Sequence, residues 1–120
     1  MNVRIHEVHG KKIAEVLSDG IIIRTSRDAA DFIGEMQSRG LKQLILYEKN
    51  VAPEFFQLTN GIAADVLQKL ANCQIKVAFV GQFNSRKNRS LEAFILESNR
   101  GDQAYFTNEL DFALERMGSS

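Results

Sequence analysis

Residues 75–80 read Ile-Lys-Val-Ala-Phe-Val, and this stretch decides the fold class. It is apolar at every position except Lys76, so it lacks the alternation typical of a strand with one wet face. A short apolar run of this kind indicates a strand buried on both faces, as in a parallel sheet. Residues 44–47, Leu-Ile-Leu-Tyr, form a second such run. The sequence therefore predicts a sheet with parallel central strands.

Helical patterns lie around these two runs. Thr25 and Asp28 form a capping-box pattern, and Gly40 offers a natural helix end. Between them, apolar side chains recur at helical spacing on one stripe: Ala29, Phe32, Ile33 and Met36. Similar stripes in residues 63–70, 91–95 and 110–117 predict three more helices. Strands that alternate with helices require crossover connections, which are right-handed in nearly all proteins.

The first part of the chain predicts antiparallel pairing. Val3 and Ile5 alternate with polar residues, Gly10 follows in a turn, and residues 13–17 resume an extended run, which together indicate a β-hairpin. Three isoleucines at 21–23 predict a third strand, and residues 104–106 predict a short strand near the end of the chain. The expected order is β-β-β-α-β-α-β-α-β-α. We expect a single α/β domain over residues 1–117, with a mixed sheet, and a flexible tail at 118–120.

Composition narrows the range of functions. The chain has 120 residues, enough for one domain, and its 15 basic residues balance its 15 acidic ones. Global charge therefore gives no reason to expect nucleic-acid binding. Cys73 is the only cysteine, so no internal disulfide forms. His6 and His9 lack metal-ligand spacing. We expect a cytoplasmic protein with no membrane span, metal or cofactor.

Six segments of the chain resemble a bacterial family of unknown function, DUF4180. They are residues 13–16, 47–50, 53–56, 61–63, 66–70 and 94–101, the last reading Phe-Ile-Leu-Glu-Ser-Asn-Arg-Gly. The resemblance runs from about Val3 to Leu114 and implies a bacterial, cytoplasmic, stand-alone domain. It implies no catalytic residue, because the family has no established activity. The element order is also similar to the STAS domain of anti-sigma-factor antagonists and to SpoIIAA-like lipid-binding folds, a likeness of topology alone.

In an open α/β sheet, ligands bind beyond the carboxyl ends of the strands. Three loops should emerge there, after Tyr47, Val80 and Phe106. The candidate ligand-binding residues on these loops are Glu48, Lys49, Asn50, Asn84, Ser85, Arg86, Lys87 and Asn108. This edge of the sheet is the first place to expect a site.

Two candidates on this edge carry alternative interpretations. The loop 84–90 concentrates three cations before a helix and could receive an anion at the helix start, or it is a solvated loop with Ser90 as the helix cap. Glu48 follows a buried strand. Its carboxylate could serve as a catalytic base, or it could accept backbone N–H groups and shape the loop.

Residues 53–61 contribute three further candidates. STAS domains carry a phosphorylatable serine at a comparable strand-to-helix junction, which makes Thr59 a phosphorylation candidate. The alternative is that Thr59 or Asn60 caps the following helix. Phe55 and Phe56 lie on a connecting loop, where aromatic side chains are more often packed than functional. Because two adjacent aromatic side chains do not easily both face inward, the alternative is that one of them lines a pocket or a partner surface.

Three functions remain open on these residues. The first is a non-catalytic regulatory or binding module with a protein partner or a small apolar or anionic ligand. The second is a small enzyme that uses Glu48 with the cations Arg86, Lys87 and Arg89. The third is a homodimer, formed through an edge strand or through the Phe55–Phe56 surface.

Overall fold

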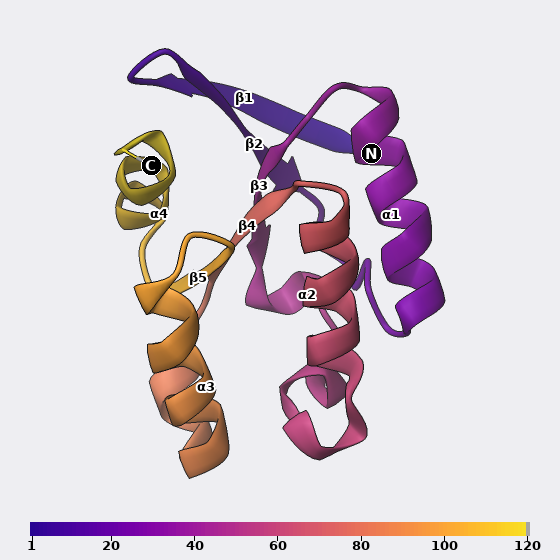
Figure 1. Ribbon diagram of the computed structural model, residues 1–120, viewed down its shortest axis with the longest axis vertical. Helices are drawn as coiled ribbons and strands as arrows, with labels where there is room; N and C mark the ends of the chain where they lie inside the picture. The colour runs from indigo at the N-terminus through magenta and orange to yellow at the C-terminus, as the bar shows by residue number, and fades with distance from the viewer. Residues whose placement is uncertain (120) are drawn as a thin grey trace.

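The computed structural model describes residues 1–119. These residues form five strands and four α-helices, whose arrangement is drawn in Figure 1. The strands are β1 (Asn2–Val8), β2 (Lys11–Leu17), β3 (Gln43–Tyr47), β4 (Lys76–Val80) and β5 (Ala104–Thr107). The helices are α1 (Ser26–Ser38), α2 (Ile62–Asn72), α3 (Arg89–Arg100) and α4 (Leu110–Ser119). Among the described residues, no helix has the length and apolar character needed to span a bilayer.

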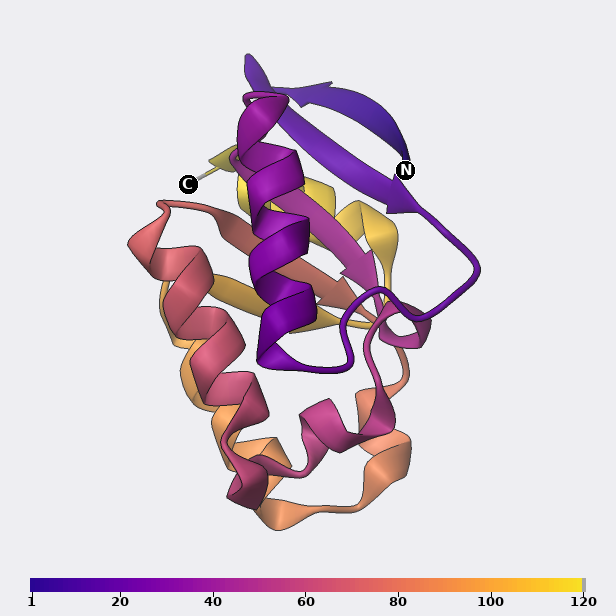
Figure 2. The same ribbon diagram turned by 90° about the vertical axis from the view of Figure 1, so that its right-hand side faces the viewer.

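The sheet keeps its strands in chain order, β1-β2-β3-β4-β5. The pair β1–β2 is antiparallel, and every later pair is parallel, which confirms the predicted mixed sheet. Helices α1, α2 and α3 pack on one face in the larger apolar core, whereas α4 packs on the other face in a smaller core. Figure 2 shows α4 behind the sheet, with α1 and α2 in front.

Local sequence signals set the helix and hairpin boundaries. Thr25 caps α1 and closes the predicted capping box with Asp28. Gly40 follows α1 with a φ of +71°, a conformation in which glycine carries no Cβ penalty. The hairpin turns on two residues, His9 and Gly10, whose φ values are +52° and +79°. Positive φ at both positions identifies the primed turn that matches the twist of paired strands.

The predicted third strand at 21–23 is wrong. Ile23 makes one isolated bridge to Val51 and joins no strand. The N–H groups of Ile22 and Ile23 both donate to the backbone oxygen of Asn50, and the N–H of Ala52 donates to the oxygen of Ile23. These bonds commit the segment to the loop after β3, so β2 leads directly to α1.

The end of the chain also differs from the expected tail. Helix α4 includes Gly118 and Ser119. Gly118 is buried, and a Cβ at this position would lie 2.4 Å from Val8 Cγ1. The close approach of α4 to β1 therefore uses a residue that we expected to lie beyond the domain. Ser120 lies outside the described residues.

Candidate functional site

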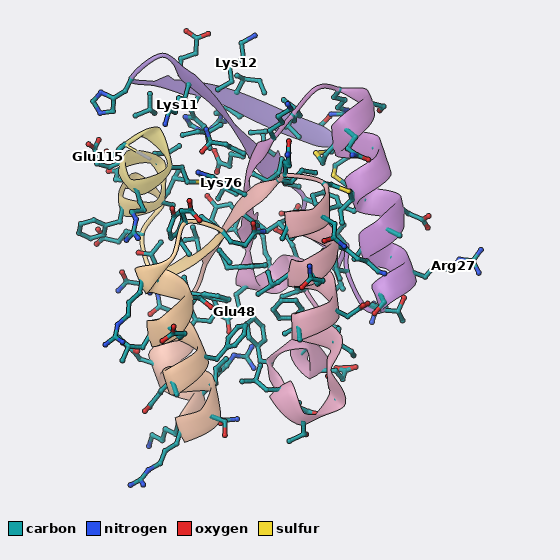
Figure 3. All side chains as sticks on the ribbon, viewed as in Figure 1. Lys11, Lys12, Arg27, Glu48, Lys76 and Glu115 are labelled. Carbon is teal, nitrogen blue, oxygen red and sulfur yellow. The ribbon has the colours of Figure 1, made fainter. Side chains whose placement is uncertain are left out.

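The three loops after β3, β4 and β5 lie on the same edge of the sheet, because β2 to β5 are mutually parallel. Four short 3-10 helices belong to these connections: η1 (Glu48–Asn50), η2 (Pro53–Phe56), η3 (Leu58–Asn60) and η4 (Phe83–Arg86). Figure 3 shows Glu48 at this edge and Lys76 farther along, where β4 begins. The predicted edge therefore exists.

Glu48 and Arg86 meet on this edge. Arg86 Nη2 and Nε lie 2.7 and 2.9 Å from Glu48 Oε2, and the Gln82 N–H donates to Glu48 Oε1 at 2.8 Å. The guanidinium also lies over the ring of Phe56, 4.1 Å from its centroid. Both carboxylate oxygens are thus engaged within the protein. Glu48 therefore links η1 to η4, and we call this arrangement of Glu48, Gln82 and Arg86 the clamp.

Gly81 makes the clamp possible. A Cβ at position 81 would lie 2.5 Å from Glu48 Cβ, closer than non-bonded carbons approach. The residue after β4 must therefore be glycine if the Glu48 side chain is to pass beside it. The N–H of Gly81 also donates to the Thr107 oxygen, which continues the hydrogen bonding between β4 and β5 beyond the end of β4.

Asn50 has a structural role. It is fully buried, and its Nδ2 donates to the oxygens of Ser18 and Gly20 at 2.9 and 3.0 Å. Its Oδ1 accepts from the Tyr47 N–H at 2.9 Å. All the amide's polar atoms have partners in the fold, so Asn50 links η1 to the segment after β2 and offers nothing to a ligand.

Phe55 and Phe56 are both buried, at 1% and 3% exposure. Both rings are packed, as the favoured interpretation held, and the alternative in which one of them lines an exposed surface does not apply. Successive residues of a 3-10 helix point about 120° apart, and each ring finds its own partner. Phe55 packs on Phe79 of β4, and Phe56 packs on Phe83 of η4.

The remaining predicted residues are exposed: Lys49, Thr59, Asn84, Ser85, Lys87, Arg89 and Asn108. Lys49 pairs with Asp19 at 3.3 Å, and the Ser85 hydroxyl donates to the Gln82 oxygen. Asn88, not Ser90, caps α3 by accepting from the Leu91 N–H. Near α2, Asn60 Oδ1 accepts from the Ile62 N–H, and Thr59 makes no capping bond there.

A cavity of about 380 Å³ opens beside the clamp, between the ends of β4 and β5 and helix α3. Its lining combines polar and apolar side chains and the glycine after β4: Gly81, Gln82, Phe83, Asn84, Glu92, Ile95, Leu96, Asn99, Phe106, Thr107 and Asn108. Within residues 1–119, the side-chain amides of Gln82, Asn84 and Asn108 have no hydrogen-bond partner. We call this space the β4–β5 cavity.

Sequence reasoning missed a second cluster, centred on Glu15. This carboxylate is 4% exposed and lies on β2. Its Oε2 accepts from the Tyr47 hydroxyl at 2.5 Å, and its Oε1 lies 2.9 Å from His6 Nε2 and 3.9 Å from Arg4 Nη1. Three strands supply the four side chains, so the cluster is a tertiary feature.

The cluster alters the acidity of two of its members. Burial acts to raise the pKa of Glu15, but the hydrogen bonds from Tyr47 and His6 and the positive charges of His6 and Arg4 outweigh it. The pKa of the Glu15 carboxyl therefore lies below its usual 4.5. Burial and the bond to Glu15 raise the pKa of Tyr47 to about 12. Glu15 stays ionised and Tyr47 stays protonated at neutral pH.

One sequence signal pointed to the cluster. Glu15 interrupts the apolar run 13–17, and a two-residue hairpin turn at His9 and Gly10 places Arg4 directly opposite it. The contribution of Tyr47 was not available in the same way, because it depends on β3 being the neighbour of β2.

Comparison with known proteins places the chain in a family. The model of the domain of unknown function DUF4180 matches residues 8–117. No curated protein and no solved structure matches the chain. The matched range covers β2 to β5, helices α1 to α3 and all of α4 except its last two residues, and it includes the clamp and the β4–β5 cavity. The chain belongs to the DUF4180 family.

Proposed function

We propose that this protein is a non-catalytic binding module of the cytoplasm that takes a small organic ligand in the β4–β5 cavity. The observation that carries the proposal is that Gln82, Asn84 and Asn108 all line this cavity and that their exposed amides make no hydrogen bond within residues 1–119. Amide groups placed around an apolar floor orient a ligand by hydrogen bonds while the floor supplies contact area. Phe83 and Phe106 belong to that floor.

The lining favours an uncharged ligand over an anionic one. Glu92 is the only charged side chain among the lining residues, and its carboxylate repels anions. Arg86, the cation nearest in sequence to the cavity loop, is held by Glu48 and Phe56. The proposed ligand therefore carries hydrogen-bonding groups and an apolar part. The likeness in element order to STAS domains supports a regulatory rather than a metabolic role, by analogy alone.

Amide-resolved NMR titration tests the proposal. The probes are a panel of uncharged metabolites that carry amide or hydroxyl groups, with inorganic phosphate as the anionic probe. We expect at least one uncharged compound to shift the backbone signals of residues 81–84 and 107–108, and Asn108→Ala to abolish the shift. Gln57→Ala, which removes an exposed amide outside the cavity, should leave it unchanged. A response to phosphate alone, or to no compound, would refute the proposal.

A second candidate function rests on the Glu48–Arg86 contact, the arrangement that a small enzyme at this edge requires. The substitution Glu48→Gln separates the two roles, because it should lower stability if the carboxylate is structural and leave stability unchanged if the carboxylate is catalytic. As a clamp, Glu48 stabilises the fold, so the substitution should lower the free energy of unfolding by about 1–3 kcal/mol. Urea denaturation measures this loss, with the exposed Glu54→Gln as the control. An unchanged midpoint for Glu48→Gln would favour the enzyme.

A further inference from the structure

We propose that the outer edge of β1 pairs with β1 of a second copy of this chain, in antiparallel register centred on Ile5. This surface lies at the opposite end of the strand order from the β4–β5 cavity, so the proposal is independent of the ligand. The sheet has two edge strands, β1 and β5.

The β5 edge is closed by a side chain. Asn99 of α3 lies alongside β5, its Oδ1 accepting from the Phe106 N–H at 2.8 Å and its Nδ2 donating to the Phe106 oxygen at 3.1 Å. The amide thus makes the two bonds that a neighbouring strand would make. An edge blocked in this way cannot recruit another strand at that residue.

The β1 edge carries no such block within residues 1–119. Figures 1 and 2 show no strand or helix beyond β1 on the side away from β2. In a two-residue hairpin the pair that flanks the turn, here Val8 and Lys11, exchanges both backbone bonds, and every second pair does the same. The backbone groups of Val3, Ile5 and Glu7 therefore point outward. Seven residues of open edge are long for an unprotected strand.

Symmetry and charge select one register. In a two-fold pair centred on Ile5, all three outward residues find partners, with Ile5 opposite Ile5 and Val3 opposite Glu7. A pair centred on Arg4 sets two guanidinium groups face to face, and one centred on Glu7 does the same with two carboxylates, both of which cost stability. A pair centred on His6 would match Val3 with His9, whose φ of +52° is outside the strand range.

Ile5 suits the centre of this interface. Its side chain is 44% exposed, one of the largest exposed apolar groups on the sheet, and contact with its symmetry mate would cover it. Pairing through one strand buries less surface than a standard stable interface. We therefore infer a dimer that dissociates on dilution rather than a permanent one.

Sedimentation equilibrium from about 1 to about 300 µM tests the pairing. We expect the weight-average mass to rise with concentration from 13.5 kDa toward twice that value. Ile5→Lys places like charges at the two-fold centre and should hold the mass at 13.5 kDa across the range. Leu17→Lys is the matched control: Leu17 is 37% exposed on β2, away from the open edge, and this variant should still associate. Circular dichroism melts check that both variants fold.

A cross-linking measurement reads the register directly. Hydrogen-bonded antiparallel pairs have Cα atoms about 5.5 Å apart, within disulfide range. Ile5→Cys in a Cys73→Ser background should form a disulfide-linked dimer on mild oxidation, and Leu17→Cys in that background should not. A wild-type mass that stays at the monomer value throughout would overturn the proposal, as would a dimer that survives Ile5→Lys. Equal cross-linking at positions 5 and 17 would also overturn it.

Discussion

The Tyr47 hydroxyl and the Glu15 carboxylate lie 2.5 Å apart, and each changes how readily the other gives up its proton. The pKa of Glu15 is lowered in the fold, so its contribution to stability is complete above its usual 4.5 and is lost as pH falls through the lowered value. The pKa of Tyr47 is raised to about 12, so its contribution is present below 10 and is lost as pH rises toward 12.

Tyr47→Phe tests this coupling. The variant leaves the Glu15 oxygen without its hydroxyl donor and should lose about 1–2 kcal/mol of unfolding free energy at pH 7. It should also lose less stability than the wild type between pH 10 and pH 12, because it lacks the phenol whose pKa is raised by folding. Urea titrations at these pH values measure both effects.

Tyr105→Phe is the control for that experiment. The Tyr105 hydroxyl is buried with no hydrogen-bond partner among the described residues, so its removal should be neutral or stabilising at pH 7. If Tyr105→Phe costs as much as Tyr47→Phe, the bond to Glu15 is not what stabilises the cluster.

At the scale of elements, η1 and the segment after β2 depend on one amide. Asn50 Nδ2 donates to two backbone oxygens of that segment, and its own backbone oxygen receives two N–H groups from it. Asn50→Asp keeps the shape but sets a carboxylate oxygen against the oxygens of Ser18 and Gly20. We expect a loss of about 3–5 kcal/mol, because a buried charge is left unpaired.

Chemical denaturation of Asn50→Asp measures that loss, and Asn60→Asp serves as its control. Asn60 is exposed, and an aspartate there keeps the oxygen that accepts from the Ile62 N–H while losing only the solvent-exposed bond from Nδ2 to the Glu54 oxygen. The control should change stability by less than about 1 kcal/mol. Similar losses in the two variants would show that the linkage through Asn50 is unimportant.

Elements defined by neighbouring residues were predictable from the sequence. A few consecutive residues are enough to recognise the capping box at Thr25, the hairpin turn at Gly10 and the buried strand in the apolar run 75–80. The isoleucines at 21–23 carry the same local signal as a strand. Their conformation depends on Asn50, about thirty residues away, whose backbone oxygen accepts from the N–H groups of Ile22 and Ile23. Local propensity was outweighed there by a tertiary hydrogen bond.

The position of the candidate site was predictable from the sequence, but its hydrogen bonding was not. Parallel strands fix which loops share an edge, so the neighbourhood of Glu48 and Arg86 followed from the strand pattern. The pattern could not tell whether the Glu48 carboxylate would be free or bound, because that depends on the Gln82 N–H and the close approach at Gly81. The cluster at Glu15 required the order of strands, which the sequence does not state.

For the molecule as a whole, we expect the block at the β5 edge to prevent edge-to-edge strand pairing between copies of the chain. Asn99→Ala frees the N–H and the oxygen of Phe106 at that edge. We expect faster aggregation on gentle heating, followed by light scattering, and a loss of about 1–2 kcal/mol in stability. Asn72→Ala, an exposed amide on α2, should aggregate at the wild-type rate. Equal rates for the two variants would mean that Asn99 does not protect the edge.

The order of the strands also bears on how the chain is made. Since each strand after β1 lies beside the one synthesised just before it, every later strand that leaves the ribosome meets a neighbour already in place. Helix α4 differs from the strands, because it is the last element to be synthesised and yet packs on β1 and β2 as well as on β4 and β5. The nascent sheet therefore keeps one apolar face bare until α4 has been synthesised, and exposed apolar surface of this kind makes a partly folded chain prone to aggregation.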